Sequence, residues 1–279
     1  RTAVAGAVRG LSTATVPVSL PSSFAPPRRA PADARLFVRL SDEDSGLMVA
    51  IGVRPDRSAR LLPPGEGPGV VAGLVAHDGE VKLARAAGRM GIPVCISTQS
   101  VTTIEAVRAG APDAWLWFQL YVWKDRRLTQ ALLQRVKEAG ADILVVTVDT
   151  PLGPKREYNS RNGFSIPLRY SARIGLDVAQ HPRWLFGVLL RYLLVTGMPT
   201  YGHYPEEFRT AVTRPAVAEA VRLENRLDWE DIRQIRQWWQ GKLVIKGVLG
   251  VADAIRSREA GADGIVVSSH GARNLDAAP

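Results

Sequence analysis

Cysteine is almost absent from this 279-residue sequence, and Cys95 is its single instance. One cysteine can form neither an intramolecular disulfide nor a cysteine-based metal cluster, and it fits a reducing compartment such as the cytoplasm. Histidine is equally scarce, with 4 residues in the chain. His77, His181 and His203 lie in irregular segments without a recurrent spacing, so we expect no metal site.

Clustered charge is also lacking, although 36 Lys and Arg against 27 Asp and Glu give a formal net charge of +9. Basic and acidic residues are interleaved, as in Lys-Asp-Arg-Arg at 124–127, which is typical of a solvated face. We therefore expect no nucleic acid partner. The positive excess instead suits anionic small molecules, because it steers carboxylates or phosphates toward a cleft.

No apolar run is long enough to cross a bilayer. The longest, at 184–198, has about 15 residues and is interrupted by Arg191, whereas a spanning helix needs about 20. Arg183, directly before this segment, and Phe186 within it make the region basic and aromatic. It predicts either a helix packed on the domain or a helix lying in a membrane surface. The expected location is cytoplasmic, with peripheral contact at the inner membrane face.

The composition and the hydrophobic periodicity of the sequence change near residue 73. Residues 1–73 are rich in Pro, Arg, Ala and Gly and keep neither a helical nor a strand period, which predicts an atypical, weakly ordered segment. In residues 74–279, short apolar runs alternate with longer amphipathic segments, as in the βα units of one domain. A connection of roughly sixty residues follows residue 148, and long loops in such folds commonly lie over the active site.

The regular part of the chain predicts parallel strands and amphipathic helices. The strands are nearly continuous apolar runs at 92–97, 115–121, 143–148, 243–248 and 265–268. Apolar residues at helical spacing predict helices at 81–90, 103–109, 128–139, 215–223, 229–239 and 251–260. Gly-Ala-Asp recurs between helix and strand at 140–142 and 261–263. This repeat favours a β/α barrel, while a doubly wound sheet stays open.

Polar side chains follow the expected strands, and in a β/α barrel the carboxyl ends of the strands meet at one mouth. An imidazole there, His270, can take a proton near neutral pH, and a carboxylate such as Asp149 would stabilise its charged form. Lys246 within an apolar strand needs either a structural ion pair or an electron-rich cofactor. Arg156 would hold a carboxylate with two hydrogen bonds, or it is a surface arginine.

These segments resemble the FMN-dependent α-hydroxy-acid dehydrogenases and oxidases, which include lactate dehydrogenase, glycolate oxidase and mandelate dehydrogenase. The resemblance covers residues 74–279, and the order of the segments agrees along it. The most specific motif is Ser-x-His-Gly-x-Arg at 268–273. The other matches are Asp-Gly-Glu-Val at 78–81, Ile-Ser-Thr-Gln-Ser at 96–100, Trp-Phe-Gln-Leu-Tyr-Val at 117–122, Thr-Val-Asp-Thr-Pro at 147–151, Lys-Arg-Glu at 155–157 and Ile-Lys-Gly-Val-Leu at 245–249.

The resemblance implies an α/β fold, the TIM (β/α)8 barrel, and FMN-dependent oxidation of an L-2-hydroxy acid, lactate-like or mandelate-like, to the 2-oxo acid. His270 would remove a proton from the substrate as two electrons pass to the flavin, and Asp149 would support its protonated form. Arg156 and Arg273 would hold the substrate carboxylate, and Tyr121 would bond to the substrate. The residues that would contact the flavin are Ser97, Gln119, Thr147 and Lys246, the last stabilising the reduced ring.

The resemblance leaves the partners of the enzyme less defined. It implies a small 2-hydroxy acid as substrate and oxygen, a quinone or a cytochrome as electron acceptor. It also implies that the full-length parent is a homo-oligomer. Another flavin barrel, such as an isopentenyl diphosphate isomerase or a glutamate synthase domain, is disfavoured by the pairing of Phe-Gln-Leu-Tyr at 118–121 with His270 and Arg273.

The chain departs from the family pattern in several places. Ser269 stands where the family has Asn, and Ala272 stands where Gly is common. Residues 1–73 lack the N-terminal features of the family and resemble a shifted reading frame of GC-rich DNA. The sequence ends at Pro279, before the expected final two strands, where such barrels place the flavin phosphate. We therefore expect an incomplete barrel, with a non-catalytic truncated or frameshifted remnant that does not retain FMN as the alternative.

Overall fold

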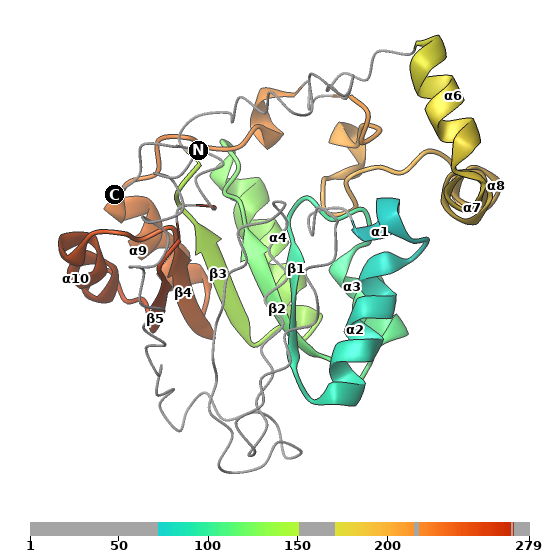
Figure 1. Cartoon of the computed structure of the whole chain (residues 1–279). Helices are drawn as coiled ribbons and strands as arrows, with labels where there is room; N and C mark the ends of the chain where they lie inside the picture. The colour runs from blue at the N-terminus through green and yellow to red at the C-terminus, as the bar shows by residue number, and fades with distance from the viewer. Residues whose placement is uncertain (1–71, 151–170, 215–217, 269, 271–279) are drawn as a thin grey trace, which may run out of the picture.

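A parallel sheet forms the centre of the molecule. The computed structural model describes residues 72–150, 171–214, 218–268 and 270. Within these ranges five strands form one sheet in the order β1-β2-β3-β4-β5 (Figure 1). The strands are β1 (Pro93–Ser97), β2 (Trp115–Leu120), β3 (Ile143–Thr147), β4 (Lys242–Lys246) and β5 (Gly264–Val266). They confirm the five expected strands to within two residues at each end.

Helices alternate with the strands. The α-helices are α1 (Ala72–Val75), α2 (Gly79–Met90), α3 (Ile104–Gly110), α4 (Arg126–Glu138), α6 (Ala172–Gln180), α7 (Pro182–Trp184), α8 (Arg191–Val195), α9 (Trp229–Trp238) and α10 (Val251–Glu259). The described residues also contain a π-helix, η3 (Leu185–Leu190), and two 3-10 turns, η4 (Glu206–Phe208) and η5 (Glu219–Val221). The predicted atypical segment, residues 1–73, lies almost wholly outside the described residues and stays a prediction.

The topology is that of a β/α barrel. Every neighbouring strand pair is parallel, and the strand order follows the chain without reversal. A doubly wound sheet would reverse its order at a switch point and carry helices on both faces. Here the large core cluster joins the helices to one face of the sheet, whereas the cluster on the other face contains strand residues alone. The predicted barrel class is therefore confirmed, with five strands in the described residues.

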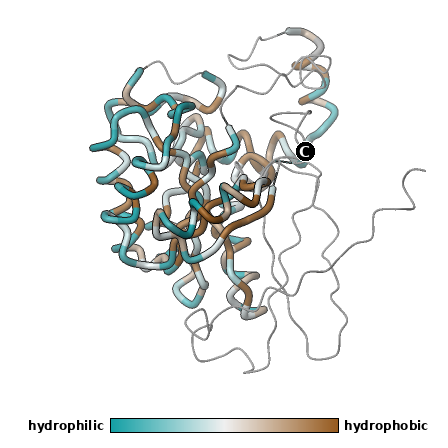
Figure 2. Tube along the Cα trace, turned by 90° about the vertical axis from the view of Figure 1, so that its left-hand side faces the viewer, coloured by the Kyte–Doolittle hydropathy of each residue, from teal (hydrophilic) through white to brown (hydrophobic). Residues whose placement is uncertain are grey.

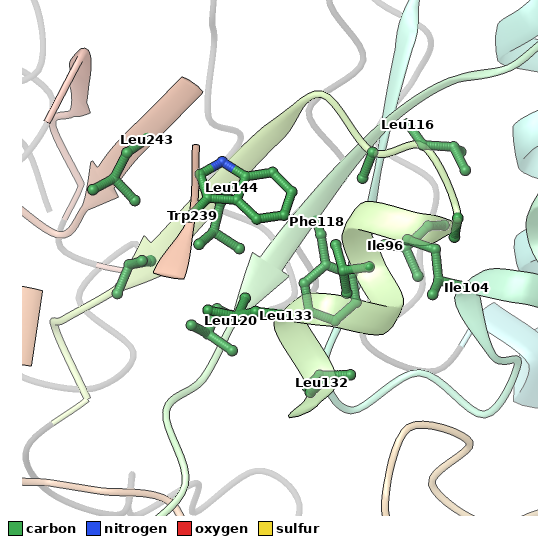
Figure 3. Close-up of a cluster of buried hydrophobic side chains, with 14 of the residues drawn as sticks. Ile96, Ile104, Leu116, Phe118, Leu120, Leu132, Leu133, Leu144, Trp239 and Leu243 are labelled. Atoms are coloured by element: carbon green, nitrogen blue, oxygen red, sulfur yellow. The ribbon is translucent and has the colours of Figure 1, made fainter. Parts of the chain in front are cut away.

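The core lies between the outer face of the sheet and the helices. Figure 3 shows Phe118 and Leu144 from the strands packed with Ile104, Leu133 and Trp239. Each of these side chains is at most 2% exposed. Burying such a side chain contributes about 1.5–3 kcal/mol. Figure 2 shows the consequence, with apolar chain in the interior and hydrophilic segments along the outer side.

Capping residues fix where the helices begin beyond the strands. The Thr103 side chain accepts a hydrogen bond from the Ala106 amide at the start of α3, and Asp125 accepts one from the Arg127 amide at the start of α4. Asp228 forms a capping box with Asp231 at the start of α9. The segments that connect strand ends to these helices are thereby held at the carboxyl edge of the sheet.

The helix expected over residues 215–223 is not observed in the described part of that range. Residues 215–217 lie outside the described residues, and the rest forms only the 3-10 turn η5. The backbone amides of Lys124 and Asp125 donate to the carbonyls of Arg222 and Ala220, at 2.9 and 3.0 Å. The backbone is extended at Ala218 and Arg222, and Leu223 forms an antiparallel bridge with Trp123. This pairing with the segment after β2 holds the chain extended, so the helical prediction was wrong there.

The long connection after β3 carries an arm, which we define as residues 171–198, comprising α6, α7, η3 and α8. Figure 1 shows it standing off from the sheet. It is attached near α1 and α2, because the Trp184 indole donates to the Leu74 carbonyl at 2.6 Å and the Asp78 amide donates to the Tyr192 hydroxyl at 3.3 Å. Among the described helices, none has both the length and the apolar character needed to pass through a bilayer.

Candidate active site

A row of polar side chains lines the inner face of the sheet at its carboxyl edge. The sheet register places Ser97 beside Gln119 and Thr147 beside Lys246. Ser97 Oγ donates to Gln119 Oε1 at 2.6 Å, and Gln119 Nε2 donates to Thr147 Oγ1 at 2.9 Å. All four side chains are buried. Because these bonds join adjacent strands, the row presents a fixed set of donors and acceptors to the mouth of the barrel.

An apolar layer supports this row. Cys95, Trp117, Val145 and Val244 form an apolar cluster with Ile143 on the same inner face. Each of the first four lies two residues before a member of the polar row, as the alternation of side chains along a strand requires. Burial raises the pKa of the Cys95 thiol to about 12, partly opposed by Lys246. Cys95 is therefore a neutral thiol near pH 7 and not a nucleophile.

Lys246 brings a buried positive charge to the row, with a residue exposure of 2%. Burial lowers its pKa, and the nearby Asp149 carboxylate opposes that change. The Lys246 Nζ atom lies 3.8 Å from Asp149 Oδ2 and 3.1 Å from each ring nitrogen of His270. A buried ammonium group is stable only beside anions or strong acceptors, and Asp149 supplies one such partner. The structural ion pair is therefore present, and the same cation can also attract an anionic or electron-rich ligand.

His270 and Asp149 form an acid–base pair. His270 Nδ1 lies 2.6 Å from Asp149 Oδ2. A carboxylate at this distance favours the tautomer that carries its proton on Nδ1. The other nitrogen, Nε2, is then the proton acceptor, and the Tyr121 hydroxyl lies 3.5 Å from it. The arrangement can remove a proton from a ligand held at Nε2 and stabilise the resulting imidazolium.

The backbone at His270 has an uncommon conformation. Its φ is 54°, in the left-handed region that residues other than glycine rarely adopt. The His270 amide donates to Ser268 Oγ at 3.0 Å, which stabilises the turn after β5. Backbone strain of this kind, about 1–3 kcal/mol, is commonly found at functional sites.

Sequence reasoning missed a glycine that makes room for Asp149. Gly247 follows Lys246 with a φ of +107°, and a Cβ there would lie 2.5 Å from Asp149 Cβ and 2.6 Å from its Cγ. Any side chain at this position would displace the carboxylate. The available signal was the Lys-Gly step at the end of an apolar strand, because a glycine there permits a close approach of neighbouring chain.

The structure brings together most of the residues that the sequence singled out. Those that meet at the mouth are Ser97, Gln119, Tyr121, Thr147, Asp149, Lys246 and His270. Arg156 and Arg273 lie outside the described residues.

The remaining histidines lie elsewhere. His203 is fully buried and accepts a hydrogen bond from the Ile104 amide at 2.9 Å. The His77 ring packs against Tyr192, with centroids 4.5 Å apart, and His181 is exposed on the arm. None of these three contacts the mouth residues in the hydrogen bonds of the described part of the chain.

The donor set of the mouth fits a flat heterocycle with carbonyl and ring-nitrogen acceptors. The row offers hydroxyl groups, a carboxamide and an ammonium group, all on an apolar support. The isoalloxazine ring of FMN has the matching acceptors along one edge, and a cation there favours its reduced form. Ser97, Gln119, Thr147 and Lys246 are thus the residues that could hold this cofactor.

Comparison with known proteins agrees with this chemistry. The family described as FMN-dependent dehydrogenase matches residues 60–279. An L-lactate dehydrogenase of Yersinia pestis is 38% identical over 223 residues, covering 78% of this chain and 56% of that protein.

Solved structures of related proteins are also similar. The crystal structure of the monotopic membrane protein (S)-mandelate dehydrogenase matches with a TM-score of 0.66 and 35% identity, covering 74% of this chain and 53% of that one. A mandelate oxidase with (S)-4-hydroxymandelic acid matches with a TM-score of 0.55 and 28% identity, covering 87% and 60%. The chain thus spans little more than half the length of these relatives. The family match, the barrel topology and the row of polar residues together show that this chain belongs to the FMN-dependent dehydrogenase family, whose cofactor is FMN.

Proposed function

We propose that this chain supplies the proton-accepting part of an FMN-dependent enzyme that oxidises an L-2-hydroxy acid to the 2-oxo acid. The observation that carries the proposal is the contact of His270 with Asp149 at 2.6 Å beside the buried Lys246. An imidazole with a carboxylate behind it is suited to take a proton from a hydroxy acid near neutral pH. The adjacent cation suits a cofactor that gains electrons in the same reaction.

Each residue at the mouth has a role in this proposal. His270 Nε2 takes the substrate proton, Asp149 stabilises the imidazolium, and the Tyr121 hydroxyl donates to the same substrate. FMN, when bound, would accept the two electrons together with the second proton that the oxidation releases. Arg156 and Arg273 hold the substrate carboxylate, a role suggested by the family motif. The residues that hold the flavin are Ser97, Gln119, Thr147 and Lys246.

The names of the relatives support lactate-like and mandelate-like acids as substrates. One relative is an L-lactate dehydrogenase, and two solved structures are a mandelate dehydrogenase and a mandelate oxidase. The electron acceptor of this chain is oxygen, a quinone or a cytochrome. Turnover of L-lactate and (S)-mandelate with oxygen, a quinone analogue and cytochrome c in parallel assays would identify both partners.

The assigned base is tested with His270→Gln, which keeps a polar side chain but cannot accept the proton. In a chain of the relatives' length, we expect turnover to be abolished while bound flavin is retained. His181→Gln is the matched control, because His181 is exposed on the arm and touches none of the mouth residues in a hydrogen bond of the described chain. Turnover by His270→Gln at the rate of the control would refute the assigned base.

A second candidate is a non-catalytic remnant that does not retain FMN. The observation that favours it is the coverage, since the chain spans 56% of one relative and 53% of another. Titration of the purified chain with FMN, followed by flavin fluorescence, separates the two candidates. We expect weak binding by this chain and tight binding by a chain of the relatives' length. Stoichiometric flavin in this chain would contradict the remnant hypothesis.

We also propose that the arm contacts a membrane surface with anionic lipids. Phe186, Leu194 and Val195 on the arm are 64%, 84% and 66% exposed, and Arg183 and Arg191 beside them are also exposed. Apolar side chains can enter the headgroup boundary while arginines pair with lipid phosphates. The related (S)-mandelate dehydrogenase is a monotopic membrane protein, which supports the same mode here.

Co-sedimentation with lipid vesicles tests this contact. The chain should sediment with vesicles that contain phosphatidylglycerol and much less with neutral phosphatidylcholine vesicles. Replacing Phe186 and Leu194 together by serine should abolish sedimentation. Met90→Ser, at an exposed apolar position on α2 (60% exposed), should leave it unchanged. Equal loss in both variants would argue against a role specific to the arm.

A further inference from the structure

Thr98 lies directly after β1. Its side chain forms hydrogen bonds with two backbone groups, one within β2 and one just beyond the end of β2. It is fully buried, at 0% exposure. Its hydroxyl donates to the Gln119 carbonyl at 2.9 Å and accepts from the Tyr121 amide at 3.0 Å. One side chain therefore joins the backbone of a residue in the polar row to the backbone of the residue that faces His270.

The sheet itself does not provide this connection. The last register pair of β1 and β2 is Ser97 with Gln119, and β2 ends at Leu120. Beyond that point the Thr98 amide donates to the Gln119 carbonyl at 2.9 Å. The Tyr121 amide therefore donates to a side-chain hydroxyl. If the pairing of β1 with β2 continued further, this amide would donate to a backbone carbonyl instead.

We propose that Thr98 is a positioning residue that holds Tyr121 against His270. The Tyr121 hydroxyl lies 3.5 Å from His270 Nε2, so a backbone shift of about 1 Å would separate them beyond hydrogen-bonding range. Only a hydroxyl can donate to one backbone group and accept from the other in so small a volume. Its catalytic consequence rests on the proposed function, but the structural contact does not.

Substitution of Thr98 separates the hydroxyl from the shape of the side chain. Thr98→Val keeps the shape and removes the hydroxyl, whereas Thr98→Ser keeps the hydroxyl. In Thr98→Val the Tyr121 amide should exchange with solvent at least about fivefold faster, because a net hydrogen bond of roughly 1 kcal/mol is lost. Thr98→Ser should retain the protection. Thr98→Ala is a second hydroxyl deletion for use if the valine variant does not fold.

Thr129 provides a matched control in the same chain. It is also fully buried, and its hydroxyl accepts from the Trp123 amide at 3.1 Å and contacts the Asp125 carbonyl at 3.4 Å. Thr129→Val should expose the Trp123 amide to exchange while leaving Tyr121 protected and turnover unchanged. This control distinguishes the effect of losing any buried threonine hydroxyl from the effect of losing the hydroxyl of Thr98.

Turnover then tests whether the contact acts through Tyr121. We expect kcat/KM for the 2-hydroxy acid to fall about tenfold in Thr98→Val, to recover in Thr98→Ser, and to be insensitive to Thr98→Val in a Tyr121→Phe background. Unchanged exchange of the Tyr121 amide in Thr98→Val, or an equal loss of kcat/KM in the Tyr121→Phe background, would overturn the proposal. If a chain of the relatives' length with unmodified Thr98 and bound FMN oxidises no 2-hydroxy acid, the proposed function fails, and amide exchange alone decides the role of Thr98.

Discussion

Replacing Gly247 by alanine would disturb the position of Asp149 without removing any functional group. The added Cβ would lie 2.5 Å from Asp149 Cβ, 2.6 Å from Asp149 Cγ and 2.9 Å from the Asp149 amide nitrogen. Carbon atoms normally approach to about 3.5 Å. Two of the three atoms are Cβ and backbone nitrogen, so a change of side-chain rotamer cannot relieve the clash. The end of β3 and the end of β4 must move apart by about 1 Å.

The expected magnitude follows from this geometry. A non-glycine residue at a φ of +107° adds backbone strain of about 1–3 kcal/mol, which should lower the free energy of unfolding by that amount. A shift of about 1 Å breaks the 2.6 Å contact of His270 Nδ1 with Asp149 Oδ2. The loss of a close charge pair costs about 1.5–3 kcal/mol, the lower part of the range measured for such pairs. Its loss should reduce kcat/KM by roughly ten- to a hundredfold.

Urea unfolding and steady-state turnover of a 2-hydroxy acid measure the two effects separately. Gly264→Ala on β5 is the matched control, because a Cβ there meets only Val244 at an ordinary contact distance of 3.7 Å. We expect that control to keep the stability and turnover of the unmodified protein. If Gly247→Ala behaves like Gly264→Ala in both assays, the reasoning that Gly247 makes room for Asp149 is wrong.

Two further predictions concern buried titratable groups. Burial, together with the nearby Arg135, lowers the pKa of His203 from 6.5 to about 4. Below pH 6.5 the unfolded chain therefore binds more protons than the folded chain, and the free energy of unfolding falls as the pH falls. The difference between the pKa values in the unfolded and the folded chain corresponds to roughly 3 kcal/mol of unfolding free energy. His203→Gln, whose side-chain oxygen can accept from the Ile104 amide, should lose less stability in urea unfolding between about pH 7 and pH 4, and equal slopes would contradict the assignment. Lys246→Met should weaken FMN binding and make the midpoint potential of bound flavin more negative, because a cation near the ring favours the reduced form. Lys242→Met, at the other end of β4 and paired with Asp263 at 3.0 Å, should leave that potential unchanged, and an equal shift in both variants would count against a specific role for Lys246.

Most of the barrel could be predicted because its signals are local. Apolar runs of five or six residues marked β1 to β4, and the helical spacing of apolar residues marked the helices packed on them. The helix expected at 215–223 failed because its backbone groups pair with residues 122–125, far away in the sequence. No local pattern carries that information, since the competing partner comes from another part of the fold.

The sequence by itself determined which side chains reach the mouth, because alternation along a strand and the shared direction of parallel strands are both local properties. Only the tertiary structure decided how these side chains meet. The contact of His270 with Asp149, the hydroxyl bridge from Thr98 to Tyr121 and the space at Gly247 all depend on distances between separate strands. Such distances are set by packing across the sheet, and they can change by an ångström without altering the pattern of apolar and polar residues.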